Sequence, residues 1–478
     1  MLFYQLEGSI SAQRLTLDNA IRIAQENSYD AQVAQFSYMA SYWTWRSFKA
    51  ELKPAVNLRG SLVDFDHSLV STRNYEDGRI NYVDNNSMEN YLTLSIDQQI
   101  AATGGTISLR SYLYRLDQFS YHETTWETQP LHISYTQPLK TYNALKWEKK
   151  TAPLEYQIAQ KNYLANMQGI AISVTTLFFN VLEAQSNLKQ SQAKMADRDS
   201  LLVTVQRRLA LGTMNKAEVL QLELSVINAR VSVNSNLVEL NDRLYKFFAY
   251  LRVSDYEGVE LIPPSFVPDV LLSADEVLET AIRNSAHSLE QKDNILAAEM
   301  ALAKAKSNQG LQLTLNSKVG LTKSSHSFSS AYSDLQDNEV IGLTLSLPIF
   351  DWGVSRGKVK MAQAKLEMVR TQQEQAHLDY VQDLHKKVIQ FNMQPAQCRD
   401  ALRAQEIAEE RYDITRRRFE TGAISVTDLN TAQQELESAK AQYISQLETF
   451  WTDYYALQKA TLHDWISNVD LSIEEIDK

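Results

Sequence analysis

The chain has 478 residues, a formal net charge of −11 and a single cysteine. The acidic balance argues against a nucleic-acid-binding protein, and the lone Cys398 excludes an internal disulfide or a metal cage built from several cysteines. The sequence has no run of about 18 apolar residues, so it predicts no membrane-spanning helix.

The first residues resemble the end of a secretory signal. Ser11 and Ala12 are small residues before Gln13, as at a cleavage site, whereas the basic part and most of the apolar part of such a signal are missing. We therefore interpret residues 1–14 as the remnant of a signal peptide. A short disordered arm is the alternative.

Residues 15–252 are predicted to form a first structural repeat, which begins with a helix near Leu15. Between about residues 56 and 138, apolar and polar side chains alternate, which is the period of strands with one apolar face. Turn residues at Gly78 and Gly104 divide this zone into two apparent hairpins.

A long helical hairpin is predicted to complete this repeat. Residues 154–262 contain no proline, and Gly212 lies between two long stretches that favour helix. After this glycine, Val219, Val226 and Val233 recur every seven residues, which keeps one apolar seam of a helix against its neighbour. We therefore expect two antiparallel helices with their tip at Gly212.

The second half of the chain repeats the first. A proline-containing linker at residues 253–270 leads to a second repeat at residues 271–465, and an acidic tail follows at residues 466–478. This repeat has a helix, one strand hairpin at about residues 311–349, and a helical hairpin with its tip at Gly422. The two helical hairpins align without a gap at a spacing of 210 residues, as these pairs show: Arg208 and Arg418, Gly212 and Gly422, Val219 and Leu429, Ala229 and Ala439, Tyr245 and Tyr455.

Neither set of strands can bury its apolar face within one chain, because so few strands cannot close a barrel. We therefore expect several copies to pool their strands into one closed sheet that faces lipid, and their helices into a tube. Aromatic residues near the strand ends suit a membrane interface, with ordinary packing as the alternative. They are Tyr112, Tyr114, Tyr121, Trp126, Tyr135, Phe350 and Trp352.

In the order, duplication and spacing of these segments, the chain resembles the TolC-like family of outer-membrane efflux proteins. The resemblance runs from about residue 15 to about residue 462, and residues 15–22, residues 345–353 and the two glycine tips carry it. It implies a mainly α fold with β, in which duplicated long helical hairpins form a trimeric α-barrel and the strands contribute to a shared transmembrane β-barrel. The extra hairpin at residues 104–138 departs from the simplest family pattern, so the strand count of the barrel stays open.

The resemblance also implies a function. A homotrimer in the outer-membrane lipid, extending into the periplasm, would serve as the exit duct of a tripartite efflux pump or a type I secretion system. Its partners would be a periplasmic adaptor and an inner-membrane transporter. It would bind no cofactor or nucleic acid and would not be an enzyme, and its exported substrate cannot be told from the sequence.

Two groups of residues are candidate sites by this resemblance. The adaptor-docking tips would be formed by Arg208, Leu209, Gly212, Arg418, Phe419 and Gly422. The alternative is that the arginines only cap the carbonyl ends of their helices. Acidic side chains that narrow the periplasmic entrance would be Glu406, Glu410 and Asp413, which can share one helical face. A solvated face paired with Arg411 and Arg416 is the alternative.

Other functions fit the sequence less well. Residues 353–359 superficially resemble a phosphate-binding loop, but the glycine spacing is short and the magnesium-binding hydroxyl is replaced by Val359. A soluble coiled-coil scaffold would explain the heptads but not two zones of alternating strands. A periplasmic adaptor would have one helical hairpin rather than two equivalent tips.

Overall fold

The structure is a computed structural model, and it describes residues 14–76, 78–212, 215–256, 258–264, 267–421 and 423–473. The chain divides into two compact units. The sheet unit comprises residues 40–157 and 289–374, and the hairpin unit comprises residues 1–39, 158–288 and 375–478. The helices and the strands of the large sheet occur in the order that the sequence predicts. The proposed signal remnant at residues 1–13 and the end of the tail at residues 474–478 lie outside the described residues.

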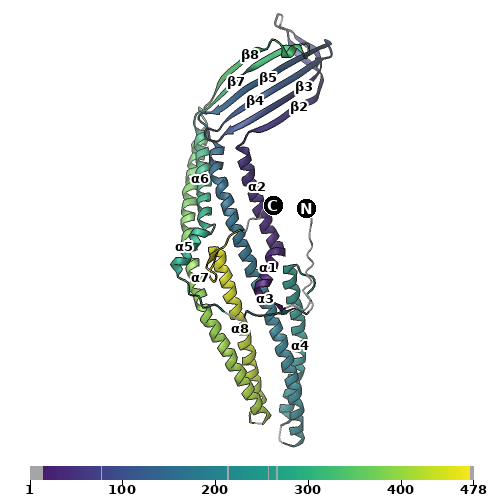
Figure 1. Ribbon diagram of the computed structural model, residues 1–478, viewed down its shortest axis with the longest axis vertical. Helices are drawn as coiled ribbons and strands as arrows, with labels where there is room; N and C mark the ends of the chain where they lie inside the picture. Colours follow the sequence, from purple (N-terminus) through teal and green to yellow (C-terminus); the bar gives the residue numbers. More distant parts are fainter. Residues whose placement is uncertain are drawn as a thin grey trace. The chain divides into compact units, whose positions relative to one another are not determined.

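The sheet unit contains one six-stranded antiparallel sheet with the order β2-β3-β4-β5-β7-β8 (Figure 1). The strands are β2 Ala55–Arg73, β3 Ile80–Ile100, β4 Gly105–Gln118, β5 Glu123–Pro138, β7 Gln312–Ser325 and β8 Gln336–Ser346. Among the described residues, β2 and β8 each pair with a single strand. The sheet therefore has two unpaired edges, which another chain can pair with.

The extra hairpin of the first half is an integral part of this sheet. It forms β4 and β5, which lie between β3 of the first repeat and β7 of the second. The alternation of apolar and polar residues in this hairpin is the same whether the hairpin lies inside the sheet or beside it. Its hydrogen-bonded register with β3 and β7 shows that it lies inside, so it adds two strands to the four strands that the two repeats share.

One face of the sheet is apolar and exposed. Directly opposed residues in antiparallel strands point to the same side, so Ile96, Leu109, Ile133 and Val319 form a row across β3, β4, β5 and β7. Ile133 is 53% exposed and Val319 is 51% exposed. We name this side the apolar face, and it continues onto β8 through Leu343 and Leu345.

The opposite face of the sheet is polar. Asp97 accepts a hydrogen bond from Ser95 at 2.8 Å and forms an ion pair with Arg110 at 3.3 Å. On the neighbouring strands, the Lys318 ammonium donates to Gln129 at 2.7 Å. The sheet thus has hydrogen-bonded polar groups on one side and apolar side chains on the other. In a sheet that covers a core the apolar side is buried, whereas here it is exposed.

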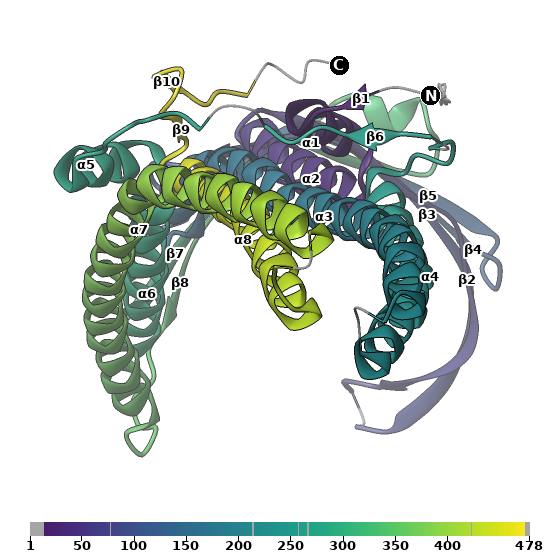
Figure 2. The ribbon, with the colours of Figure 1, turned by 90° about the horizontal axis from the view of Figure 1, so that it is seen from below.

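The helices of the two repeats match closely. They are α1 Leu17–Asn27, α2 Tyr29–Glu51, α3 Ala144–Ala210, α4 Lys216–Leu251, α5 Ala274–Asn284, α6 His287–Gln309, α7 Val354–Glu420 and α8 Val426–Thr461. Each bound of α7 and α8 lies 210 residues after the corresponding bound of α3 and α4. Figure 2 views the chain from below and shows the α3–α4 and α7–α8 hairpins next to each other.

The core of the hairpin unit is aromatic. Phe178, Phe247, Phe391 and Phe450 are at most 1% exposed, and the rings of Phe178 and Phe247 meet edge to face with centroids 6.1 Å apart. Burying each such side chain stabilises the fold by about 1.5–3 kcal/mol relative to leaving it exposed to water. The short helices α1 and α5 close this core through their own apolar faces, because residues spaced three and four apart share one side of a helix.

The sequence predicts no helix that could span a membrane, and α3 departs from this expectation. It is long enough, and over one 18-residue window apolar enough, to cross a membrane by length and composition alone. Within α3, Val174 and Phe178 are fully buried in the core of the hairpin unit. Core packing therefore accounts for part of this apolar stretch, of which 39% is buried.

Short strands tie the ends of the described chain to the hairpin unit. β1 Arg14–Leu15 pairs in parallel with β6 Glu260–Leu261, which lies in the predicted linker. β9 His463–Asp464 pairs with β10 Val469–Asp470. Of these residues, Arg14 lies in the predicted arm, Glu260 and Leu261 in the predicted linker, and Val469 and Asp470 in the predicted tail.

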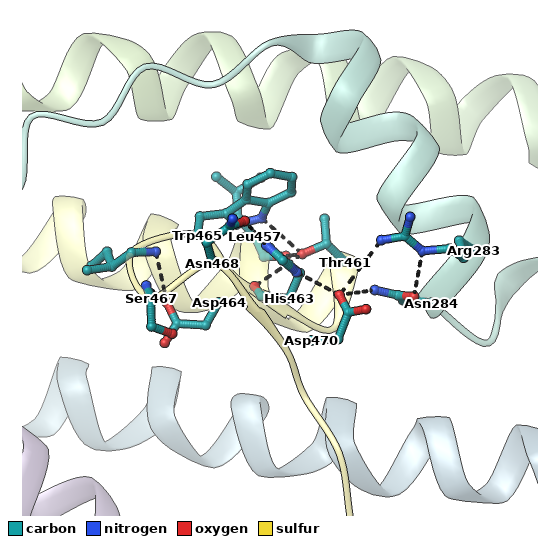
Figure 3. Close-up of polar contacts among 11 residues, drawn as sticks. Arg283, Asn284, Leu457, Thr461, His463, Asp464, Trp465, Ser467, Asn468 and Asp470 are labelled. Atoms are coloured by element: carbon teal, nitrogen blue, oxygen red, sulfur yellow. Dashed lines mark hydrogen bonds and ion pairs between the residues drawn. The ribbon is translucent and has the colours of Figure 1, made fainter.

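A polar cluster fixes the C-terminal segment, and we name it the C-terminal clasp (Figure 3). His463 Nδ1 lies 2.7 Å from a carboxylate oxygen of Asp470, which also accepts from the Asn284 amide at 2.7 Å. The indole of Trp465 donates to the Thr461 hydroxyl at 3.1 Å. The clasp thus connects the segment after α8 to the end of α5.

Candidate functional site

The first hairpin tip is a tight turn after α3. Gly212 has φ +73°, a left-handed conformation that glycine adopts without strain, and its N–H donates to the Leu209 carbonyl at 3.0 Å. The next helix, α4, starts after Asn215, whose side chain accepts from the Ala217 N–H at 3.1 Å. The first tip thus lies at Gly212, as the sequence predicts, and the left-handed conformation of this glycine ends α3.

The second tip has an equivalent cap. Ser425, 210 residues after Asn215, caps α8 and forms a capping box with Asp428. These hydrogen bonds from Ser425 hold the pKa of the Asp428 carboxyl below its usual value. The Ala423 N–H donates to the Arg418 carbonyl at 2.9 Å. Gly422 itself lies outside the described residues.

An apolar cluster joins the two tips. Its buried members are Leu201, Val205, Val219, Leu222, Phe419, Val426 and Leu429, so all four long helices contribute. Phe419 is only 2% exposed, and Leu209 packs against the cluster. Phe419 therefore belongs to the core between the hairpins rather than to a docking surface. Gly212 and Arg418 are exposed, and Arg208 is partly buried with polar contacts of its own.

A polar cluster lies within about four helical turns of the tips, and we name it the hairpin lock. Its centre is Asp197 of α3, which accepts from the Tyr412 hydroxyl at 2.6 Å and forms an ion pair with Arg416 at 2.7 Å. Next to it, Arg198 is 1% exposed and donates to the Asn430 side chain at 2.7 Å. The lock thus connects the first hairpin to both helices of the second.

Burial and charge shape the titration of the lock. Burial, and then the hydrogen bond to Asp197, raise the pKa of the Tyr412 hydroxyl well above its usual value, so it stays a donor at neutral pH. Burial lowers the pKa of the Arg198 guanidinium from its usual value, and the nearby Tyr412, Asp197 and Glu437 oppose this.

The sequence did not single out the lock. Tyr412 and Asp197 lie 215 residues apart in the chain and match no spacing motif. The sequence predicts Arg416 only as a partner of acids on its own helix, whereas its shorter ion pair is to Asp197 on the other hairpin. The one signal of the lock in the sequence is that Arg198 and Tyr412 interrupt the apolar seams of their helices.

The three acidic candidates for the periplasmic entrance are all exposed on α7. Glu406 forms an ion pair with Arg403 at 2.8 Å. Among the residues that the structure describes, Glu410 and Asp413 have no ion pair. Arg411 and Arg416 pair instead with Glu435 and Asp197. Two of the three carboxylates thus have no cationic partner within the described part of one chain.

No group of three or more metal-ligating side chains occurs in the described part of the chain. Cys398 is buried, its thiol donates to the Gln446 carbonyl at 3.4 Å, and burial raises the pKa of this thiol to about 11. A thiol with so high a pKa is a poor nucleophile.

Comparisons with known proteins agree with this arrangement. Residues 282–461 match the family model described as outer membrane efflux protein. Outer membrane protein TolC of Escherichia coli (strain K12) is 22% identical over 328 residues, which cover 64% of this chain and 64% of that protein. Outer membrane protein TolC of Vibrio cholerae is 22% identical over 331 residues, covering 65% of this chain and 73% of that protein.

Solved structures extend the likeness to almost the whole fold. The outer-membrane channel OprN superimposes with a TM-score of 0.67 at 12% identity, covering 94% of this chain and 90% of that one. The outer membrane protein VceC from Vibrio cholerae gives a TM-score of 0.65 at 15% identity, covering 93% of this chain and 95% of that one. The predicted resemblance to the TolC-like family is confirmed, as is a mainly helical fold with strands.

Proposed function

We propose that this chain, which carries an outer membrane efflux protein domain over residues 282–461, is a trimeric outer-membrane exit duct. The observation that carries the proposal is the sheet, which exposes an apolar face and leaves two edges unpaired. A lone copy in water would expose this face at a cost, whereas lipid can cover it.

The dimensions of the apolar face suit a bilayer. On β7 the apolar face begins at Leu313 and ends at Leu321, a span of nine residues, and Lys323 follows on the same side. On β8 the apolar side chains run from Leu345 to Ile341, and the next residue on this face, Glu339 opposite Val319, is charged. A transmembrane β-strand needs about 9–11 residues when it is tilted about 45°. Three copies joined through β8 and β2 would close a barrel of eighteen strands, and the polar face would then line its lumen.

The tips are proposed as the adaptor-docking surface. Arg208, Leu209, Gly212, Arg418 and Gly422 retain this role, and Phe419 supports them from the core. In support, the two tips have equivalent caps 210 residues apart, so three copies would present six similar tips to one ring of partners. The remaining partner would be an inner-membrane transporter on the far side of the adaptor.

Two groups of residues are proposed to control the periplasmic entrance, one by its charge and the other by holding the two hairpins together. Glu406, Glu410 and Asp413 would set a negative field at the entrance, because three copies bring their exposed carboxylates near one axis. The hairpin lock would hold the two hairpins of each copy together, since its bonds cross from one hairpin to the other. Releasing the lock would then widen the entrance.

A soluble coiled-coil scaffold is disfavoured, because it offers nothing to cover the apolar face. The proposal is tested by fractionating cells and measuring conductance in planar bilayers. We expect the protein in the detergent-extracted outer membrane, as a trimer, with single-channel currents that prefer cations. Recovery as a monomer from the soluble fraction would contradict the proposal.

A further inference from the structure

The loop between β7 and β8 has a feature that a pore does not require. It contains the short helix η1 Ser330–Tyr332, the small green helix near the far end of the sheet in Figure 1. This helix contacts β5 and β7 rather than extending past the ends of the strands. Ala331 is fully buried there, and its carbonyl accepts a hydrogen bond from Thr128 of β5.

The register shows which face of the sheet the loop covers. Thr128 lies opposite Leu113, and Leu113 lies opposite Leu92. Leu92 points to the same side as Leu94 and Ile96, because alternate residues of a strand share one face. Thr128 is therefore on the apolar face, and the loop that it binds folds back onto that side.

The loop lies where the apolar face ends. Opposite Thr128 on β7 is Lys323, the first charged residue after Leu321. At this level an aromatic group forms: the ring of Phe328 meets Trp126 of β5 edge to face with centroids 5.2 Å apart, and Tyr332 lies 5.3 Å from Phe328. Phe328 is 51% exposed and Tyr332 is 42% exposed, although their loop is anchored by a buried hydrogen bond.

We propose that this loop is a membrane-surface anchor, in which Phe328 and Tyr332 insert among the headgroups of the outer leaflet. The inference rests on the proposed function, because it requires the apolar face to contact lipid. Aromatic residues with one apolar and one polar side prefer the membrane–water interface. A neighbouring copy is a poorer candidate for the cover, because the short helix of the loop packs on the inner strands β5 and β7.

The test uses the full-length protein reconstituted in phosphatidylcholine vesicles that carry nitroxide lipids. In a Cys398→Ser background, a single cysteine is placed at Phe328, at Leu343 of the apolar face, or at Tyr75, which is fully exposed in the β2–β3 loop. Each cysteine carries the same small fluorophore. We expect headgroup nitroxides to quench the probe at 328 several-fold more than the probe at 75, and acyl-chain nitroxides to quench the probe at 343.

Two failures can be told apart. If the probe at 343 is quenched but the probe at 328 responds only to a water-soluble quencher, the anchor is wrong and the channel stands. If the probe at 343 is not quenched, both the lipid-facing assignment of the sheet and the anchor are wrong.

A further variant adds Thr128→Val, which removes the hydroxyl that donates to the Ala331 carbonyl. It should reduce headgroup quenching at 328 and leave quenching at 343 unchanged, and equal quenching with and without this substitution would contradict the role of the loop geometry.

Discussion

Gly212 has its place in the first tip because of its backbone conformation, not because of a contact. Its φ is +73°, and nothing lies within 4 Å of the position that a Cβ would occupy. An alanine there would therefore meet no clash, only the strain of a left-handed conformation.

We expect Gly212→Ala to lower the free energy of unfolding by about 1 kcal/mol. The matched control is Gly357→Ala inside α7, where a Cβ would also meet nothing within 4 Å and the φ is not in the left-handed region. That substitution should stabilise the helix by roughly 0.5–1 kcal/mol. Denaturant unfolding of the two variants should therefore shift in opposite directions, and equal shifts would refute the backbone argument.

Tyr412 is the residue of the hairpin lock that can be changed most conservatively. Tyr412→Phe keeps the ring and removes the hydroxyl that donates to Asp197 at 2.6 Å. The loss of this hydrogen bond should weaken the contact between the two hairpins by about 1–3 kcal/mol. We expect a larger single-channel conductance in planar bilayers, because one bond between the hairpins is lost. The control is Tyr455→Phe, whose hydroxyl has no hydrogen-bond partner among the described residues. If both variants conduct like the parent, the lock does not restrain the entrance.

At the scale of elements, the repeat accounts for the helices and their caps. Asn215 and Ser425 begin α4 and α8 at equivalent positions with different side chains, since either oxygen can accept from the first helical N–H groups. The repeat breaks at the ends of the halves. The C-terminal clasp, which uses residues after α8, has no counterpart in the described residues of the first half.

The clasp should loosen in acid. The hydrogen bond from His463, followed by that from Asn284, lowers the pKa of Asp470 from its usual value. A carboxyl whose pKa is lower in the folded than in the unfolded state stabilises the fold above its unfolded pKa of about 3.9. That contribution is lost as the pH falls through the lowered folded value. The protection factors of the amides in residues 463–470, which compare their exchange with the intrinsic rate at each pH, should therefore fall below about pH 4.

Two substitutions check the origin of this pH dependence. Asp470→Asn should give fast exchange in the clasp already at neutral pH and flatten its pH dependence. Asp275→Asn, at an exposed acid in the first turn of α5, should leave the exchange of residues 463–470 unchanged. A parent-like pH profile in Asp470→Asn would assign the acid response to other groups.

At the scale of the whole molecule, the two faces of the sheet decide where the protein can reside. Adjacent residues of β8 test this directly. Leu343 is 62% exposed on the apolar face, whereas Thr344 points to the polar face. A lysine on a lipid-facing strand costs roughly 2–4 kcal/mol near the midplane of the bilayer.

Leu343→Lys should therefore reduce the yield of protein folded into lipid vesicles, measured by resistance to added protease. Thr344→Lys places the same charge one residue away, on the side proposed to line the lumen, and should fold like the parent. Equal losses for the two variants would show that the face of the sheet does not matter, and with it the lipid-facing assignment would fail.

Periodicity in the sequence determined the long helices, their duplication at a spacing of 210 residues and the two zones of strands, because these follow from local spacing of apolar residues, glycines and prolines. Tertiary structure alone decided three matters: that β4 and β5 lie within the sheet, that Phe419 is buried between the hairpins, and that Tyr412 and Arg416 meet Asp197. Each depends on residues far apart in the chain. Pairing of that kind is set by how whole elements pack, and no local pattern of residues encodes it.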